Sequence, residues 1–348
     1  MSFWSQGDMS TSDTDLKEAM FWEEEGDAVR CHLCPHSCLV NEGKKGICRV
    51  RGNVKGRLYA LSYAKVSSMH MDPIEKKPLF HFKPGHPVLS FGGVSCNLRC
   101  QHCQNFTIAQ AGLDEFPLRT VPPQEVPDLC RQYRSNGVAW TYNEPTIWHE
   151  YVLDASRLCK EKGLFTVSVT NGFIQEEPLR SLKGVIDAMN IDVKGFSETF
   201  YKEVCKGQLA PVLRSCETAR EMGVHVELTY LIIPTRNDGR EEIDGFCQWV
   251  RDRMGVSTPV HFSRFHPDYK MEGLPPTPRS TMEMAFKTAK GKGLEYVYMG
   301  NLVTEEGENT YCPGCESLLI RRTGFHAEVV GVKGGRCSKC GRPVDVVW

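Results

Sequence analysis

The sequence predicts an α/β protein built around a parallel sheet, and three observations support this class. Between Val88 and Met299, short apolar runs alternate with amphipathic stretches, which is the pattern of repeated βα units. Three closely spaced cysteines follow the first of these runs, at the end of an expected strand, where parallel α/β folds place their active sites. The 348 residues suffice for about two domains or for one large barrel with additions.

Seven β-rich runs bounded by turn residues are the expected strands. With the stretches between them they make about six βα units in just over two hundred residues. A closed eight-unit barrel usually takes about 250 residues, so the count favours an incomplete barrel or an open doubly wound sheet. The expected strands cover residues 88–94, 138–142, 164–169, 188–193, 224–233, 259–265 and 294–299.

Amphipathic spacing between the strands predicts the helices. Ile147–Cys159 carries apolar residues on one helical face, and Gly163 follows as a stop signal. Thr277 before Pro278 is typical of an N-cap with proline at the first helical position. The same apolar spacing recurs in residues 126–133, 243–250 and 282–289.

Composition and charge exclude several classes of protein. Hydrophobic residues make up 41% and charged residues 24%, which is ordinary for a globular chain. The formal net charge of −1 gives no global basic field for nucleic acid or an anionic membrane. The first thirty residues are polar and acidic, and no stretch reaches about eighteen apolar residues, so we expect a cytoplasmic protein that is not membrane-bound.

The sixteen cysteines fall into two kinds. A cytoplasmic compartment keeps thiols reduced, so metal or redox chemistry is expected in place of a disulfide framework. Eleven cysteines cluster in residues 31–48, 96–103 and 312–340. The five scattered cysteines, which we expect to be buried small apolar residues, are Cys130, Cys159, Cys205, Cys216 and Cys247.

The central cysteines give the sharpest chemical signal. Cys96, Cys100 and Cys103 form the pattern C-x3-C-x2-C directly after the first expected strand. Structural zinc and simple electron-transfer clusters normally take four protein ligands, so three thiolates suggest a [4Fe-4S] cluster with one iron open to a small molecule. The alternative is a zinc loop that borrows a fourth ligand such as His102.

This pattern after the first strand resembles the radical S-adenosylmethionine (SAM) superfamily. The resemblance implies a partial (β/α)6 barrel with a [4Fe-4S] cluster and SAM as cofactors. It also implies that the amino and carboxylate groups of SAM chelate the open iron. Electron transfer from the reduced cluster then cleaves SAM to methionine and a 5′-deoxyadenosyl radical.

The resemblance also implies which residues contact SAM. TYNEPT, residues 141–146, is similar to the family's Gly-Gly-Glu-Pro segment, whose glutamate accepts a hydrogen bond from the SAM ammonium. TNG (170–172) and IDVKG (191–195) resemble segments of glycyl-radical-enzyme activating proteins that bind the SAM ribose or carboxylate, and the residue before the third cysteine lies beside adenine. The implied residues are His102, Glu144, Thr170, Asn171, Asp192 and Lys194.

The match to that SAM pocket is partial. Thr141, Tyr142 and Asn143 stand where the family has glycines, and Val169 stands where activating enzymes often have an aspartate. Lys194 would supply positive charge for the SAM carboxylate. No catalytic side chain is implied beyond these contacts.

Near the amino end, four cysteines have the spacing C-x2-C-x3-C-x9-C. Four thiolates close a metal site, and both structural zinc and an auxiliary iron–sulfur cluster fit this count. His32 and His36 are spare ligands in the same segment. The four cysteines are Cys31, Cys34, Cys38 and Cys48.

The carboxyl end carries two C-x2-C knuckles, typical of a zinc ribbon. Cys312 and Cys315 form the first, and Cys337 and Cys340 form the second. Each knuckle contains a glycine for its turn, Gly314 or Gly341, and a module this small is expected to depend on zinc for its fold. Its basic side chains are expected to be solvated: Arg321, Arg322, Lys333, Arg336, Lys339 and Arg342.

Segments along nearly the whole chain resemble one family, the AmmeMemoRadiSam system radical SAM enzymes, which are related to pyruvate formate-lyase activating enzymes. They are RCHLCPHSC, DPIEKKPLFHFKPG, CNLRCQHCQNF, TYNEPT, FHPDYKM, PPTP, YVYMGN and the closing ribbon. The resemblance implies an activating-enzyme-like oxidoreductase, a reductant such as a flavodoxin or ferredoxin, and accompanying Memo-type and AMMECR-type proteins. It does not imply the substrate.

These features divide the chain into five expected segments. They are an acidic extension (1–23), a metal-binding segment with four cysteines (24–60), a linker packed on the barrel (61–87), the radical SAM partial barrel (88–303) and the zinc-ribbon-like module (304–348). The proline-rich stretch 72–85 shows neither helical nor strand period and is expected either to line the pocket or to be a packing loop. Polar residues of interest outside the motifs are Asp72, Glu75, His81 and His266.

Two other function classes stay open from the sequence. One is a metal-binding interaction protein, whose ribbon and cysteines dock a partner while the central cluster senses redox state. The other is a nucleic-acid-modifying radical enzyme, which rests only on the basic ribbon. The count of three central cysteines favours the SAM-cleaving enzyme, because a purely structural cluster is expected to have a fourth protein ligand.

Overall fold

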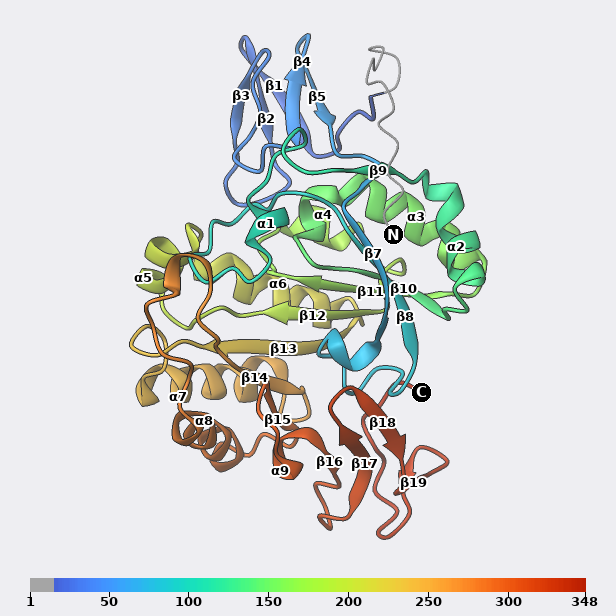
Figure 1. Ribbon diagram of the computed structural model, residues 1–348, viewed down its shortest axis with the longest axis vertical. Helices are drawn as coiled ribbons and strands as arrows, with labels where there is room; N and C mark the ends of the chain where they lie inside the picture. The colour runs from blue at the N-terminus through green and yellow to red at the C-terminus, as the bar shows by residue number, and fades with distance from the viewer. Residues whose placement is uncertain (1–15) are drawn as a thin grey trace.

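The computed structural model describes residues 16–348 and shows three regions along its long axis (Figure 1). A small β region from the amino end lies at one end, and the C-terminal β region lies at the other. The α/β unit predicted from the sequence lies between them. Within residues 16–348, no helix has the length and apolar character required to cross a membrane.

The central unit is built on an eight-stranded sheet in the order β15-β14-β13-β12-β11-β10-β8-β7. All seven expected strands are present and parallel, and β7 pairs antiparallel with β8 at the edge. The parallel strands follow chain order without reversal, which excludes the doubly wound alternative. The strands are β7 (Ser68–Pro73), β8 (Pro87–Gly92), β10 (Gly137–Trp140), β11 (Phe165–Thr170), β12 (Ala188–Asp192), β13 (His225–Ile232), β14 (Val260–Arg264) and β15 (Val297–Gly300).

The expected helices connect these strands and bury their apolar faces against them. In α3, for example, Tyr151, Ala155 and Cys159 are buried, and the chain leaves the helix at Gly163, which has a φ of 74°. The longer helices are α2 (Val126–Gln132), α3 (His149–Glu161), α6 (Leu209–Glu221), α7 (Arg240–Trp249) and α8 (Arg279–Gly291). Shorter turns are α1 (Phe106–Ala109), α4 (Glu176–Arg180), α5 (Glu198–Phe200) and α9 (Glu305–Glu308).

The start of α8 differs from the prediction by one residue. Pro278 has an extended backbone and occupies the N-cap position itself. The hydroxyl of Thr277 accepts a hydrogen bond from Phe265 N and donates one to Ile232 O. Thr277 therefore ties the chain to strand ends and does not cap the helix.

The N-terminal region consists of the three-stranded sheet β1 (Trp22–Glu25), β2 (Ala28–Cys31) and β3 (Leu39–Asn41) and the hairpin β4 (Arg51–Val54)–β5 (Arg57–Ala60). A buried ion pair between Arg51 and Glu150, 2.8 Å long, joins this region to α3. Lys17 also pairs with Asp154 of α3. The described part of the expected acidic extension is thus packed on the central unit, and its residues 1–15 lie outside the described residues.

The proline-rich linker has more structure than its sequence predicts. Asp72 and Pro73 end strand β7, and Ile74–Lys76 forms a short 3-10 helix. The buried Glu227 carboxylate accepts hydrogen bonds from Phe80 N and His81 N, so the linker is tied to β13. A two-residue pair, β6 (Lys65–Val66) with β9 (Arg119–Thr120), holds the preceding segment.

The C-terminal region contains the sheet β16 (Thr310–Tyr311), β17 (Leu318–Thr323), β18 (His326–Val329) and the pair β19 (Val332–Lys333)–β20 (Arg336–Cys337). The expectation of solvated basic residues is wrong for Arg322, which is 3% exposed. Its guanidinium lies 4.1 Å from the Phe80 ring centroid and donates to Phe80 O and Thr310 Oγ1. Burying this cation joins the module to the linker.

Candidate active site

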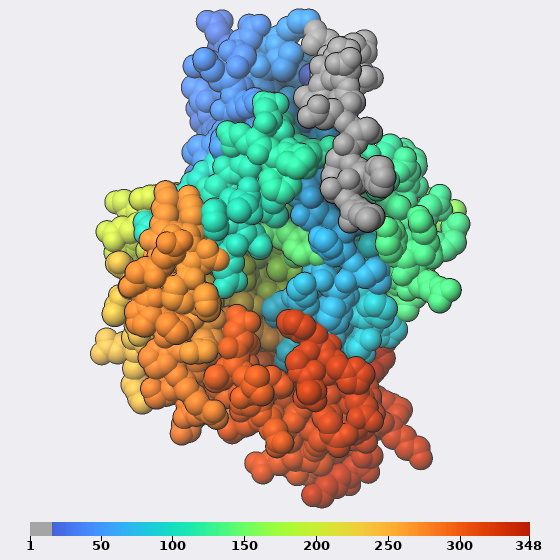
Figure 2. All heavy atoms as spheres, viewed as in Figure 1, coloured from blue at the N-terminus to red at the C-terminus, as the bar shows by residue number. Residues whose placement is uncertain are grey.

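A cavity of about 600 Å³ opens at the carboxyl ends of the parallel strands. This volume is within the range of small-molecule and cofactor sites. Figure 2 shows the surface hollowed where teal, blue, orange and red segments meet, with green to yellow residues of the central strands at its floor. The three central cysteines and all six residues implied to contact SAM line this one cavity.

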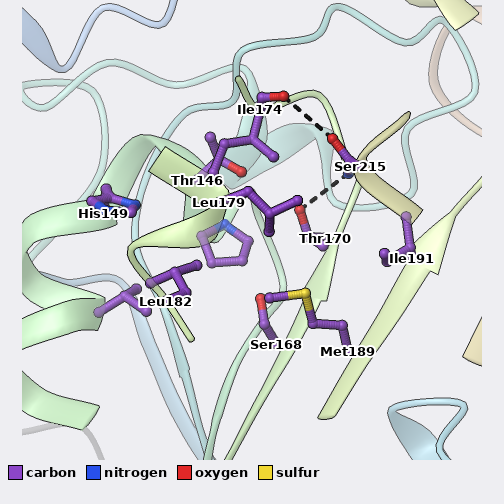
Figure 3. A pocket seen from close by; sticks show the side chains of 13 residues that line it. Thr146, His149, Ser168, Thr170, Ile174, Leu179, Leu182, Met189, Ile191 and Ser215 are labelled. Carbon is purple, nitrogen blue, oxygen red and sulfur yellow. Dashed lines mark hydrogen bonds between the residues drawn. The ribbon is translucent and has the colours of Figure 1, made fainter. Parts of the chain in front are cut away.

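A second cavity, on the other side of Thr170, is too small for a cofactor. It measures about 20 Å³, which is room for about one water molecule. Figure 3 shows its lining of mainly apolar side chains, with Leu179 and Leu182 opposite Met189 and Ile191. Thr170 lines both cavities, so it belongs to the wall between the large cavity and this packing defect.

The central cysteine loop begins directly after β8. Cys96 Sγ accepts from Leu98 N at 3.4 Å and from the Asn171 side-chain amide at 3.6 Å. Burial raises the pKa of Cys103 to about 11 and raises that of Cys96 as well. Because the pKa is this high, the thiols stay protonated unless a metal centre stabilises the thiolates.

Three asparagines hold this loop, a role that the sequence did not reveal for any of them, although Asn171 was expected to contact SAM. Asn171 Nδ2 donates to Asn97 Oδ1 at 2.9 Å, and Asn97 Nδ2 donates to Phe173 O at 2.7 Å. Asn143 accepts from Gly93 N and donates to Ser95 O, both at 2.9 Å. The side chain of Asn143 thus binds the cysteine loop at the position where the resembling family has a glycine.

Glu144 lies in the wall of the cavity between β10 and β11 and is 1% exposed. Its Oε1 accepts from Thr146 N and Thr170 Oγ1, and its Oε2 accepts from Asn171 N at 2.8 Å. Burial raises its pKa, although these hydrogen bonds oppose the shift. A carboxylate oxygen has two lone pairs, so Oε2 can accept one more hydrogen bond from the cavity.

His102 and Lys194 give the cavity one neutral and one charged side chain. Burial, together with the charge of Lys194, lowers the pKa of His102 to about 3, and neither ring nitrogen has a hydrogen-bond partner among the described residues. The His102 ring stacks on Phe200 with centroids 6.0 Å apart. Burial would lower the pKa of Lys194, but Asp192, which pairs with Lys194 Nζ at 2.7 Å, acts together with Cys100 and Cys205 to hold that pKa well above its usual value.

Cys205 is buried, as expected, but it also lies at this site. Its sulfur belongs with Cys100 Sγ and a His102 nitrogen to a group of atoms that all lie within 4.8 Å of one another. Cys96 and Cys103 are not members of that group. The structure therefore does not gather the ligand set of the zinc-loop alternative, which requires all three central cysteines with His102.

The opposite side of the cavity is formed by the linker and the last strands. Lys77 Nζ and the Tyr142 hydroxyl both donate to Asp72, whose pKa burial would raise but these bonds hold well below its usual value. His261, on β14, also lines the cavity and bonds Glu227 at 2.7 Å. Sequence reasoning missed His261 and Glu227. The sequence marks each of them only as a polar residue inside an otherwise apolar strand.

The other residues singled out from the linker and β14 have separate positions. Glu75 lines the cavity, and one of its carboxylate oxygens is buried without a partner in the part of the chain that the structure describes. His81 is fully buried and bonds the Tyr298 hydroxyl and Asp345 O, each at 2.6 Å, so it joins the linker to the C-terminal region. His266 is exposed, bonds its neighbour Pro267 O, and is not among the residues that line the cavity.

The four C-terminal cysteines form a compact group. All four sulfurs lie within 4.8 Å of one another, with 3.5 Å between Cys312 and Cys340 and 3.7 Å between Cys315 and Cys337. Tetrahedral zinc with bonds of about 2.3 Å separates its sulfurs by about 3.8 Å, so this donor set fits zinc. In the turns, Gly341 has a φ of 77°, whereas Glu316 takes the left-handed conformation in the first knuckle instead of Gly314.

The four N-terminal cysteines also lie together but more loosely. They line one small apolar cavity with Leu33, Val40 and Ile147. Within residues 16–348, they are not among the groups whose ligand atoms all lie within 4.8 Å of one another. The two outer cysteine sites therefore differ in geometry.

Several known proteins are similar to parts or all of this chain. The model of the radical SAM superfamily matches residues 92–250, which include the cysteine loop and the ends of β10 to β13. An uncharacterized protein of Methanocaldococcus jannaschii is 49% identical over 335 residues, which cover 95% of this chain and all of that protein. Pyruvate formate-lyase 1-activating enzyme of Escherichia coli K12 is 23% identical over 210 residues, covering 54% of this chain and 82% of the relative. A solved radical SAM methyltransferase from Sphaerobacter thermophilus has a TM-score of 0.48 at 12% identity, covering 63% of this chain and 67% of its own.

Residues 92–250 of the chain belong to the radical SAM superfamily. Within that superfamily the chain is homologous to pyruvate formate-lyase activating enzymes from Escherichia coli and Clostridium pasteurianum. Membership implies a [4Fe-4S] cluster and SAM, and the cavity fits both, because its wall combines three thiols, an acceptor carboxylate and a buried ammonium. The narrower AmmeMemoRadiSam assignment stays a prediction from sequence.

Proposed function

We propose that this protein cleaves SAM reductively with a [4Fe-4S] cluster held by the central cysteines and abstracts a hydrogen atom from a protein or small-molecule substrate, like an activating enzyme. One observation carries the proposal: the three central cysteines and the six residues implied to contact SAM come from separate strand ends and line a single cavity. We further propose that the parallel strands form the partial barrel of this family.

The cofactors supply the radical chemistry, and the chain supplies binding, orientation and exclusion of water. Cys96, Cys100 and Cys103 would hold the cluster and leave one iron open. The free lone pair of Glu144 Oε2 would accept from the SAM ammonium, and Lys194 would pair with the SAM carboxylate. Asn143 and Asn171 position this wall by binding the cysteine loop.

His102 would lie beside the adenine ring. Its depressed pKa keeps the imidazole neutral, so it offers a flat, uncharged face and one nitrogen of each hydrogen-bonding type. The substrate would enter from the opposite side of the cavity, where His261, Tyr298 and Phe325 lie. Phe325 comes from the turn between β17 and β18, so the C-terminal region contributes to this side.

The proposal extends to metals and partners. We propose zinc at the C-terminal cysteines and a flavodoxin or ferredoxin as reductant. Memo-type and AMMECR-type proteins are the first substrates or partners to test. The alternative of a nucleic-acid-modifying enzyme loses part of its basis, because Arg322 is buried and Arg342 is paired with Glu295.

The test is SAM binding and cleavage by the anaerobically reconstituted protein. We expect 5′-deoxyadenosine and methionine from the wild type, and Glu144→Gln should weaken SAM binding by roughly ten- to a hundredfold, because a charge-assisted hydrogen bond contributes about 1.5 to 3 kcal/mol. Iron content should be unchanged in that variant. Glu176→Gln, at an exposed glutamate on α4, is the matched control and should bind SAM normally.

Unchanged SAM affinity in Glu144→Gln would show that this carboxylate does not contact SAM. Absence of 5′-deoxyadenosine from wild-type protein with a full cluster would contradict the proposed function itself. If the wild type does form 5′-deoxyadenosine, mass spectrometry of candidate partner proteins after turnover would identify a protein substrate by its radical-derived modification.

A further inference from the structure

The four N-terminal cysteines are spaced more loosely than the four C-terminal cysteines. They line one small cavity whose other walls are mainly apolar. In the C-terminal group all four sulfurs lie within 4.8 Å of one another, whereas the N-terminal sulfurs do not form such a group within residues 16–348. A single tetrahedral ion holds its sulfurs about 3.8 Å apart, so the looser set fits a larger metal centre.

We propose that the N-terminal cysteines bind a second [4Fe-4S] cluster, which passes electrons from a protein reductant to the central cluster. Four cysteine ligands leave no iron open to a small molecule, so electron transfer is the chemistry that such a cluster supports. The ligands are Cys31, Cys34, Cys38 and Cys48.

A buried cation without a full set of partners among residues 16–348 faces the same cavity. Arg51 is 1% exposed and lines the cavity, and its Nε is buried with no hydrogen-bond partner in that part of the chain. Its Nη1 is occupied by Glu150. A cluster with four thiolate ligands is anionic and its sulfurs accept hydrogen bonds, so a bound cluster would explain the free N–H of Arg51.

Direct contacts connect this site to the central cysteine loop. His36 lies between Cys34 and Cys38 in sequence, and its Nε2 bonds Asn97 O at 2.7 Å, one residue after Cys96. Arg99 donates to Cys96 O and also to Ile47 O, the residue before Cys48. Two short hydrogen-bonded routes therefore join the two sets of cysteines.

The outer side of the site has the features of a docking surface for an acidic electron carrier. Leu39 and Ile47, the neighbours of Cys38 and Cys48, are 50% and 48% exposed. Lys44 and Lys45 on the adjoining loop are exposed. An apolar centre beside two lysines suits a flavodoxin or ferredoxin with acidic surface charge. That carrier would lose one electron, which the N-terminal cluster would gain and pass to the central cluster.

Metal content tests the cluster independently of activity. We expect about eight iron atoms and one zinc per reconstituted full-length chain, falling to about four iron atoms with unchanged zinc in the Cys34→Ala/Cys38→Ala variant. The reduced variant should lose one of two EPR signals. Cys216→Ala, at a buried cysteine outside all three groups of clustered cysteines, is the matched control and should keep all its iron.

Two results would overturn the cluster assignment. One is about four iron atoms with two zinc ions in the wild type, and the other is full iron in the double variant. Retained zinc and central iron in the variant show that it has folded. Lys44→Glu/Lys45→Glu leaves every cysteine in place and should keep all metal while raising the KM for a ferredoxin or flavodoxin in a salt-dependent way.

The proposed transfer of electrons from the N-terminal cluster to the central cluster, called the relay below, rests on the proposed function. A separate comparison of reductants therefore tests it. With reduced flavodoxin, SAM cleavage by Cys34→Ala/Cys38→Ala should fall by about tenfold or more, whereas with dithionite it should stay within about twofold of wild type. An equal fall with both reductants, or no fall with either, would overturn the relay. If wild-type protein cleaves no SAM with either reductant, the proposed function fails, while the iron count still decides the cluster.

Discussion

The two cysteine-rich ends of the chain carry equal numbers of thiols but hold them differently. The C-terminal thiols form a compact group of the size that fits one zinc ion. The N-terminal thiols surround a cavity and contact the central cysteine loop through His36 and Arg99. Ligand count alone therefore does not decide the metal, because the spacing of the sulfurs and their neighbours differ.

The two ends also attach to the central unit by different means. The N-terminal region uses a buried ion pair, with Arg51 and Glu150 both nearly inaccessible to solvent. The C-terminal region uses Arg322 on the face of Phe80 and a hydrogen bond from His81 to Asp345 O. The first attachment holds the region that carries the N-terminal cysteines, whereas the second holds the region whose Phe325 lines the large cavity.

Loss of the C-terminal metal should have the largest effect. In zinc-finger peptides, structural zinc contributes apparent binding free energies of about 10 to 16 kcal/mol, all of it coupled to folding. We expect Cys337→Ala to lose one zinc per chain and to unfold β16–β20, which amide hydrogen exchange would show as lost protection. Full zinc content in this variant would contradict the ribbon assignment, and Cys247→Ala, at a buried cysteine of α7, is the control.

Removal of Arg51, the buried cation of the N-terminal region, should have the next largest effect on stability. Arg51→Ala leaves Glu150 buried and unpaired, and breaking such a pair costs about 3 to 5 kcal/mol. Denaturant unfolding would measure this loss. Arg57→Ala removes an arginine of the same region whose partner, Glu18, is also exposed, and it should change stability by less than about 1 kcal/mol. Equal effects of the two variants would show that Arg51 does not anchor the region.

Acid should weaken both attachments through buried histidines. Burial lowers the pKa of His81, at the C-terminal contact, and of His149, which packs on Phe21 of the N-terminal region, to about 4 each. Between that value and the unfolded pKa of about 6.5 the unfolded chain binds more protons, so stability falls as the pH drops through this window. Each histidine contributes a slope of at most about 1.4 kcal/mol per pH unit.

Thermal unfolding measured at pH 7.5 and 5.0 checks this expectation. His149→Gln should flatten the pH dependence, because the glutamine does not titrate in this range. His86→Gln, at a half-buried histidine beside Asn136, should leave the dependence as it is in the wild type. A wild-type stability that is constant between these pH values would contradict the assignment of neutral histidines to the folded state.

Periodicity predicted the parallel strands well, because each is a buried apolar run. It missed β7, an antiparallel edge strand with the sequence SMHMDP, whose pairing depends on backbone hydrogen bonds with β8 and not on an apolar pattern. The start of α8 lies one residue from its predicted position, because the Thr277 hydroxyl hydrogen-bonds to distant strand ends and does not cap the helix. Such partners lie far away in sequence and leave no local signal.

The candidate site shows the same limit. The six residues implied to contact SAM lie at strand ends, and parallel strands bring those ends together, so their meeting in one cavity was predictable. Asn143 and Glu227 gain their roles from long-range contacts with the cysteine loop and the linker. Arg322 was expected to be solvated, since its sequence neighbours do not show that Phe80 covers it.

The smallest expected effects concern exposed ion pairs, and they test whether the two ends differ only in their buried parts. Arg321 pairs with Glu328 across β17 and β18, and Arg57 pairs with Glu18 in the N-terminal region, in each case between exposed side chains. Water screens both pairs, so Arg321→Ala and Arg57→Ala should each change the free energy of unfolding by less than about 1 kcal/mol, and less at high salt. Denaturant titrations at low and high salt measure both. A loss of several kcal/mol in either variant would mean that surface charge, and not the metal sites and buried contacts, holds that end of the molecule.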